Sequence, residues 1–185
     1  MEGANLVLFK FDELMMQEDI EALLTFIAEA FKDRAMPETV IKAESPDSDL
    51  YEDAQEFTGK AWQQITCAEL QQYYDAIFGF SPEAFRYFLP GIYCAGIREN
   101  QPNLIVNSSL VSCLDRGNAP NSWDDFFAKR WPQLSPKECE ATQKWLLWLS
   151  DCGACEDIAL SRAFDTLNIL ANQKGAIPIA SWVKK

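Results

Sequence analysis

The chain has 185 residues, no histidine and a formal net charge of −12. This length fits one domain whose core is large enough to fold without disulfides or metals. The lack of histidine excludes Ser-His-Asp and Cys-His nucleophiles within the chain. The acidic balance disfavours nucleic-acid phosphates and anionic membrane surfaces as partners.

The apolar segments are too short for export or for membrane insertion. The run from Leu6 to Phe9 is interrupted by Lys10, whereas a secretory signal needs a longer apolar stretch. No segment approaches the ~20 apolar residues that span a bilayer. We therefore expect a soluble, cytoplasmic protein. In that reducing compartment the six cysteines are expected to be free thiols.

Helical periodicity dominates the chain from end to end. Apolar residues from Ile20 to Phe31 recur at helical spacing and predict a helix over 18–34. A loop with two prolines is expected over 36–48. The further expected helices cover 49 to about 58, 67–78, 82–98, 104–114, about 123–131, 136–150 and 155–173. An amphipathic pattern of this kind predicts helices that pack around one core.

Local capping signals mark where several of these helices begin. The sequence Thr66-Cys67-Ala68-Glu69 fits a capping box, in which the threonine and glutamate side chains satisfy each other's free N–H groups. Ser135-Pro136-Lys137-Glu138 adds an N1 proline to the same pattern. Ser81 is expected to cap the next helix in the same way, again with proline after it. Ser122 is expected to open the short helix before residue 131.

Glycine and proline mark the expected ends and interruptions. Gly79 is expected as a C′ residue with positive φ, and Pro90 is expected to interrupt or kink its helix. Strand signals are limited to 6–11 and 177–183. The predicted fold class is all-α: an irregular multi-helix bundle with at most one or two short strands. Residues 1–185 are expected to form a single helical domain.

Negative charge is concentrated in the N-terminal third. Residues 1–57 hold fifteen acidic and four basic side chains, whereas 58–185 hold thirteen and twelve. On a helix, the segment 49–57 (DLYEDAQEF) places carboxylates on one face and apolar side chains on another. A solvated helix face that aids solubility explains this stripe, and so does a docking surface for a basic protein. The candidate partner-binding residues are Asp47, Asp49, Tyr51, Glu52, Asp53 and Glu56.

Two further motifs suggest chemistry only weakly. Cys152 and Cys155 form a C-x-x-C, the spacing of redox and metal sites. The acidic residues around them are expected to raise the thiol pKa values, and no predicted strand precedes the motif. A metal site made only of carboxylates along the acidic stripe is a second alternative. Neither motif implies a cofactor or names catalytic residues.

Arginines among aromatic residues form another pattern, in Phe85-Arg86-Tyr87 and again in Lys129-Arg130-Trp131. We expect Arg86 either to extend its charged end to solvent or to pair with a carboxylate in the core. A structural role is favoured for both segments.

The segments that contain these arginines carry a family resemblance. SPEAFRYFLPGIY at 81–93 and FFAKRWPQLSPKECEATQKWLLWL at 126–149 resemble an uncharacterised group of small bacterial helical proteins of unknown function. Trp62 fits the same pattern. The resemblance covers roughly 60–150 and implies a bacterial origin and a helical scaffold. It implies no catalytic residues, because none are assigned to that group.

The leading hypothesis is therefore a non-catalytic binding protein. We expect an immunity protein or inhibitor that occludes a basic bacterial toxin domain through its acidic surface, with Tyr51 as an anchor. Replacing Glu52, Asp53 and Glu56 by lysine is expected to slow association without changing the fold. The alternatives are a small carboxylate- or metal-dependent enzyme and a subunit of a larger assembly, which leaves homo-oligomerisation open.

Overall fold

A computed structural model describes residues 2–41, 49–116 and 123–173. Side chains are described from Gln17 onward, except that of Asp49 in α2 and that of Gln173. Over these ranges the chain forms α-helices and two 3-10 turns, and the described residues contain no strand. The elements are α1 (Glu2–Phe31), α2 (Asp49–Gln55), η1 (Trp62–Gln64), α3 (Cys67–Gln72), α4 (Ala76–Gly79), α5 (Pro82–Arg98), α6 (Ile105–Leu114), α7 (Asp125–Arg130), η3 (Trp131–Gln133), α8 (Pro136–Asp151) and α9 (Asp157–Gln173). The all-α prediction is confirmed.

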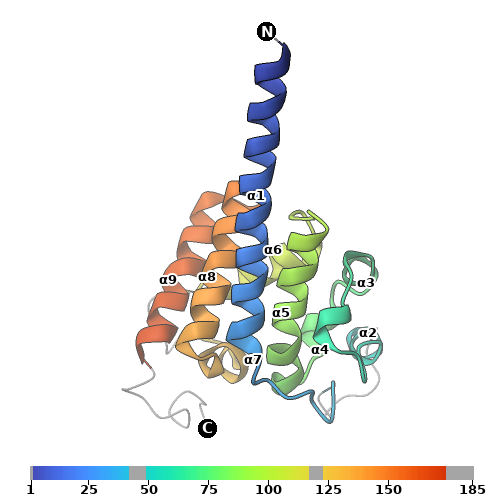
Figure 1. Cartoon of the computed structure of the whole chain (residues 1–185). Helices are drawn as coiled ribbons and strands as arrows, with labels where there is room; N and C mark the ends of the chain where they lie inside the picture. Colours follow the sequence, from blue (N-terminus) through green and yellow to red (C-terminus); the bar gives the residue numbers. More distant parts are fainter. Residues whose placement is uncertain (1, 42–48, 117–122, 174–185) are drawn as a thin grey trace.

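The long helices lie side by side in the order α9, α8, α1 and α5 (Figure 1). The helix α6 packs against α9, and α7 packs against α5. The short helices α2, α3 and α4 gather beyond α5, at the side of the molecule away from α9. The N-terminal part of α1 extends past the ends of its neighbours. The acidic segment and the last helix therefore lie on opposite sides of the bundle.

The helix α5 is the centre of the core. Every residue from Ala84 to Ile97 is buried, because α1, η1, α3 and α7 all pack against this helix. Pro90 lies inside α5, which is one helix throughout, so the expected interruption is wrong. The free energy gained by burying α5 on all sides outweighs the free energy that a proline costs inside a helix. Gly91 is needed because a Cβ at this position would lie 2.5 Å from the carbonyl oxygen of Trp62.

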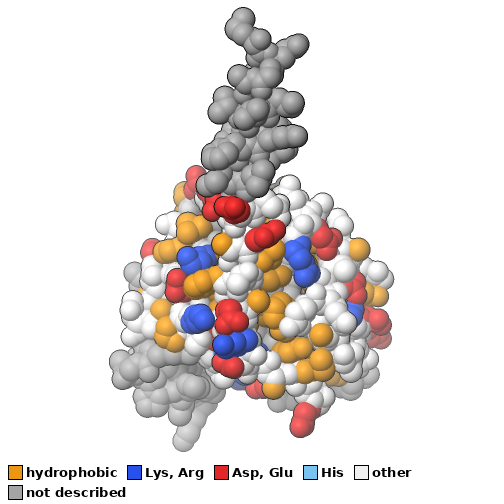
Figure 2. All heavy atoms as spheres, viewed as in Figure 1, with side chains coloured by type: hydrophobic (Ala, Val, Ile, Leu, Met, Phe, Trp, Pro, Cys, Tyr) orange, Lys and Arg blue, Asp and Glu red, His pale blue; other side chains and the backbone are white. Residues whose placement is uncertain are grey.

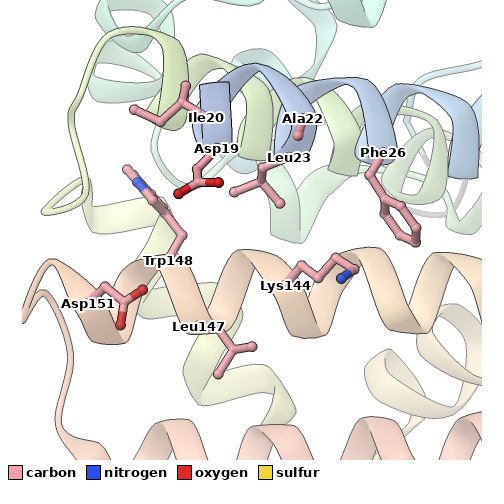
Figure 3. A pocket seen from close by; sticks show the side chains of 9 residues that line it. All are labelled: Asp19, Ile20, Ala22, Leu23, Phe26, Lys144, Leu147, Trp148 and Asp151. Atoms are coloured by element: carbon pink, nitrogen blue, oxygen red, sulfur yellow. The ribbon is translucent and has the colours of Figure 1, made fainter. Parts of the chain in front are cut away.

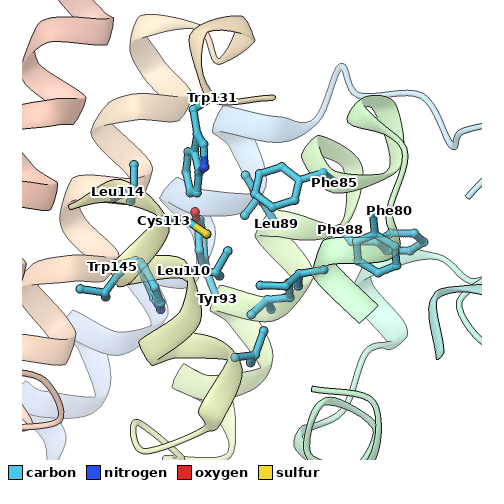
Figure 4. Close-up of a cluster of buried hydrophobic side chains, with 14 of the residues drawn as sticks. Phe80, Phe85, Phe88, Leu89, Tyr93, Leu110, Cys113, Leu114, Trp131 and Trp145 are labelled. Atoms are coloured by element: carbon cyan, nitrogen blue, oxygen red, sulfur yellow. The ribbon is translucent and has the colours of Figure 1, made fainter. Parts of the chain in front are cut away.

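Aromatic rings fill the space around α5 (Figure 4). Tyr93 stacks on Trp145 of α8 with ring centroids 4.4 Å apart, and Phe85 meets Trp131 edge-on at 5.2 Å. Both tryptophans are fully buried. Offset and edge-on ring pairs add to the free energy of burial. These two ring contacts connect α5 to α8 and to η3.

The capping signals are confirmed at three helix starts. Thr66 and Glu69 form the capping box of α3, and Ser135 and Glu138 form that of α8. Ser81 accepts a hydrogen bond from the backbone N–H of Ala84 at the start of α5. Each of these signals acts within four residues, so the surrounding fold does not alter it.

Two predictions about helix bounds and strands are wrong. Residues 6–11 belong to α1, which begins at Glu2, because the helix of the following residues continues through them. The helix expected over 67–78 is divided into α3 and α4 by a turn at Tyr73. The predicted strand over 177–183 lies outside the described residues, as do Ser122 and the loop 42–48. The short helix α7 is capped by Asp124, whose side chain accepts from the N–H of Phe127.

Candidate docking surface on helix α2

The helix α2 is fixed to the bundle by a very close backbone contact. A Cβ on Gly79 of α4 would lie 2.2 Å from the carbonyl oxygen of Leu50 and 3.0 Å from the Cβ of Ala54. Gly79 has no positive φ, so the expectation of a left-handed C′ residue is wrong. Glycine is required here because the two helices approach so closely. As a result α2 lies directly against α4.

Two of the three side chains predicted for the apolar face of α2 point into the core, whereas the third, Leu50, is 37% exposed. Ala54 and Phe57 are 0% and 1% exposed. The Phe57 ring meets Phe80 at 5.3 Å and Phe88 at 5.5 Å, both edge-on. The helix itself ends at Gln55, so Phe57 lies in the turn that follows. The opposite face of α2 therefore faces solvent.

The six candidate residues divide into three groups. Glu52 and Glu56 are exposed, and Glu56 lies one residue beyond the end of α2. Tyr51 and Asp53 are half-buried, and Asp53 makes an interaction of its own. Asp47 lies outside the described residues, and the side chain of Asp49 is likewise not described. Glu52 and Glu56 are thus the described carboxylates that a partner can reach.

Exposed apolar side chains are found on α2 and on the segment that packs against it. Leu50 is 37% exposed, and Tyr74 and Phe78 on the neighbouring α4 segment are each 38% exposed. The helices α2 and α4 pack against each other, so Tyr74 and Phe78 lie on a segment that neighbours α2. The sequence did not identify Tyr74 or Phe78, because they belong to a different segment of the chain. We name this group the acidic α2 surface: Leu50, Tyr51, Glu52, Asp53, Glu56, Tyr74 and Phe78.

Lys60, which follows α2 closely in the sequence, is engaged elsewhere. Lys60 forms an ion pair with Glu69 of α3, and its ammonium group lies 5.3 Å from the centre of the Phe57 ring. Burial raises the pKa of the Glu69 carboxyl, but hydrogen bonds from Lys60 and Thr66 outweigh it and lower that pKa overall. Lys60 therefore already has a carboxylate partner, which lies outside the acidic α2 surface.

The arginines among aromatics have structural contacts. Arg130 donates to the carbonyl oxygens of Phe80 at 2.6 Å and Phe126 at 3.3 Å, and its guanidinium lies 4.0 Å from the centre of the Phe126 ring. Arg86 is buried and reaches the exposed Glu83 at 3.3 Å. Arg86 thus pairs with a carboxylate, but that carboxylate is at the surface and not in the core as the second alternative expects. The structural reading also fits Arg130, which joins α7 to the start of α5.

The cysteine motif lies at the turn between α8 and α9. All six cysteines are free, and Cys152 is exposed whereas Cys155 is half-buried. Burial raises the pKa of both thiols, and the carboxylate of Asp151 raises that of Cys152 further. A raised thiol pKa disfavours the reactive thiolate. Among the described residues, no group of three or more cysteine or acidic side chains is placed to hold a metal ion.

Two apolar grooves border the outer face of α8. The α1/α8 groove (Figure 3) has a volume of about 400 Å³, and its lining includes Leu23, Phe26 and Trp148. The α8/α9 groove, of about 420 Å³, is lined in part by Leu160 and Phe164. Leu147, which is 54% exposed, borders both grooves. Figure 2 shows this side of the molecule, where apolar side chains lie between acidic and basic ones.

Comparisons with known proteins do not assign the chain to a family. No protein-family model matches it, and neither a curated protein nor a solved structure matches it. The resemblance to the group of bacterial helical proteins therefore stays a prediction. Within the described part of the chain, no helix is long and apolar enough to cross a membrane.

Proposed function

We propose that the protein is a binding protein that occludes a basic partner through the acidic α2 surface. The observation that carries this proposal is the exposure of carboxylates on and just after α2, together with exposed aromatic side chains on the neighbouring α4 segment. Glu52 and Glu56 supply the charge, and Tyr74 and Phe78 supply apolar area. An immunity protein or inhibitor of a cationic bacterial toxin domain is the specific form of this proposal.

The two kinds of side chain act at different stages of binding. Carboxylates attract a cationic surface over several ångströms, so they speed encounter with the partner. The aromatic side chains then lose water against the partner and slow dissociation. Because Gly79 holds α2 against α4, little conformational entropy is lost on docking. Occlusion of the partner's cationic site follows from this placement.

A quantitative capture experiment tests this proposal. Tagged wild-type protein and the double variant Glu52→Lys/Glu56→Lys are used to capture proteins from a lysate of the native host, and bound proteins are compared by mass spectrometry. Asp53 is left unchanged because it makes an interaction of its own. The expected partner is basic, is released by high salt, and binds the variant at least tenfold less.

The double variant Glu156→Lys/Asp165→Lys is the matched control. Both residues are exposed at or near α9, and the change in net charge is the same. The control variant should retain the partner, and purified wild-type protein should inhibit the partner's activity. Equal loss of binding in the two variants would show that only net charge matters. A partner that binds the α2 variant as well as it binds the wild type would refute the acidic α2 surface.

A second candidate function is that of a subunit that associates with its own kind. The helix α1 begins at Glu2 and extends past the rest of the bundle (Figure 1). In the sequence, nine of the thirteen residues from 4 to 16 are apolar, and at helical spacing they fall on every face. A helix that is apolar all round is normally buried. Association of two copies through this stretch is the simplest way to bury it.

Sedimentation velocity of the full chain from about 1 to 100 μM tests the second candidate. Concentration-dependent association that is lost on Phe9→Asp is the expected result. The control Ile105→Asp changes an apolar residue that is 55% exposed at the start of α6 and should leave association intact. A wild-type chain that sediments as a monomer throughout this range would exclude self-association.

A further inference from the structure

The α8/α9 groove is an apolar surface with an acidic border. Leu146 and Leu147 line it from α8, and Leu160 and Phe164 line it from α9. Among the described residues that line it, Asp157 and Asp165 are charged and none is basic. A segment that fits this groove therefore combines apolar side chains with positive charge.

The chain itself contains such a segment directly after α9. Residues 174–185 read KGAIPIASWVKK, with three lysines and no acidic residue. Ile177, Ile179, Trp182 and Val183 supply apolar groups. Pro178 cannot continue the hydrogen bonding of a helix, and Gly175 favours a change of chain direction. The sequence of this segment thus favours a turn followed by an extended stretch.

The segment is long enough to reach from the end of α9 to the far end of the groove, which lines α9 from Asp165 to Asp157. From Gln173 back to Asp157, α9 rises about 24 Å at about 1.5 Å per residue. The eight residues from Ile177 to Lys184 span about 26 Å when extended, at about 3.3 Å per residue. A turn over residues 174–176 would therefore bring Trp182 level with Leu160. Lys184 would then lie level with Asp157, at the far end of the groove.

We propose that residues 177–184 fold back along α9 and occupy the α8/α9 groove, with Trp182 between the two helices and Lys184 beside Asp157. This docking is independent of the acidic α2 surface, which lies on the opposite side of the bundle (Figure 1). Burial of Trp182 against Leu160 and Phe164 drives the contact. The attraction between Lys184 and Asp157 sets its direction.

NMR of the full, isotope-labelled chain tests the proposal. Residues 177–184 should show the backbone order of the helices, and the Trp182 ring should give cross-peaks to the methyl groups of Leu160. Leu147→Asp should release the segment and abolish these cross-peaks. The matched control is Ile158→Asp, because Ile158 is 67% exposed and does not line the groove. This control should keep the cross-peaks.

A charge variant tests the direction of docking. Lys184→Glu/Lys185→Glu should lower the docked population about tenfold, and added salt should weaken docking of the wild type. Cross-peaks from Trp182 to the α1/α8 groove would overturn the assignment. So would rapid internal motion of residues 177–184 in the wild type. Cross-peaks that appear only as concentration rises would show that the segment docks on a second copy, and would overturn the intrachain contact.

Discussion

Arg34 donates two hydrogen bonds to the carboxylate of Glu138, at 2.6 and 2.7 Å, across 104 residues of chain. Glu138 also accepts from the backbone N–H of Ser135 as part of its capping box. The Glu138 carboxylate therefore caps the N-terminus of α8 and also links this helix to Arg34, which follows α1. Its side chain is only 4% exposed, so its contacts are strong and costly to break.

Replacement of this carboxylate should destabilise the fold. We expect Glu138→Gln to lower the free energy of unfolding by about 3 kcal/mol at pH 7, because the guanidinium of Arg34 loses its anionic partner. Urea unfolding followed by circular dichroism measures this difference. Glu140→Gln, an exposed residue on the same helix, should change the stability by less than about 0.5 kcal/mol.

The effect of Glu138→Gln should also depend on pH. Burial raises the pKa of the Glu138 carboxyl, but hydrogen bonds from Arg34 and Ser135 outweigh it, so the folded pKa is lowered overall. A lowered acid pKa stabilises the fold above the unfolded value of about 4.3, and this contribution is lost as pH falls through the folded pKa. The stability difference between wild type and variant should therefore be constant from pH 6 to 8 and shrink below about pH 4. An unchanged difference at pH 3 would contradict this linkage.

Two glycines of α5 should respond to alanine in opposite ways. A Cβ on Gly91 would meet the Trp62 carbonyl oxygen at 2.5 Å, whereas the nearest atom to a Cβ on Gly96 lies 3.6 Å away. We expect Gly91→Ala to cost about 2 kcal/mol, because η1 and α5 must move apart. Gly96→Ala should be neutral or stabilise by up to about 1 kcal/mol, since glycine weakens a helix interior. Thermal unfolding of both variants compares them; equal melting temperatures would contradict the assigned contacts.

The buried arginines should also differ from each other. The Nε and one terminal nitrogen of Arg86 are buried without a hydrogen-bond partner, so Arg86→Met should leave stability unchanged or raise it by up to about 2 kcal/mol. Arg130→Met removes the hydrogen bond to Phe80 and the contact with the Phe126 ring. This change should lower stability by about 2 kcal/mol. Urea unfolding distinguishes the two variants, and a larger loss for Arg86→Met would contradict the prediction.

Thiol labelling should follow burial. Cys152 is exposed and should react first with a disulfide reagent, followed by the half-buried Cys155. Burial raises the pKa of Cys94 and Cys113 to about 11 each, so these thiols should react only when the protein unfolds. Labelling of Cys152 should accelerate from pH 7 to 9, and Asp151→Asn should speed it at constant pH by removing a nearby negative charge. Early labelling of a buried cysteine, read by peptide mass spectrometry, would contradict this order.

Sequence reasoning succeeded where the signal was local. The capping boxes at Thr66 and Ser135 involve neighbouring residues, and both are present. The N-terminal apolar run was assigned as a strand because a short apolar stretch does not distinguish strand from helix. The role of Gly79 also escaped prediction, because its requirement comes from Leu50, which is far away in the chain.

The candidate site was only partly predictable for the same reason. The amphipathic pattern of residues 49–57 correctly placed Ala54 and Phe57 in the core. It could not show that the segment with Tyr74 and Phe78 neighbours α2, because that arrangement arises from packing between α2 and α4. The half-buried position of Asp53 is likewise set by tertiary contacts. The helical periodicity of the sequence identified the solvent-facing side of α2. Tertiary packing determined which other residues accompany it at the surface.

The packing of α1 against both α5 and α8 has a consequence for synthesis on the ribosome. Arg34 leaves the ribosome 104 residues ahead of its partner Glu138, a delay of roughly 5 to 20 seconds at cellular elongation rates of about 5–20 residues per second. During that interval Ile27 and Phe31, which are fully buried in the finished protein, lack the α8 side of their packing. The nascent chain therefore presents an apolar helix that a holdase chaperone can bind until α8 is complete.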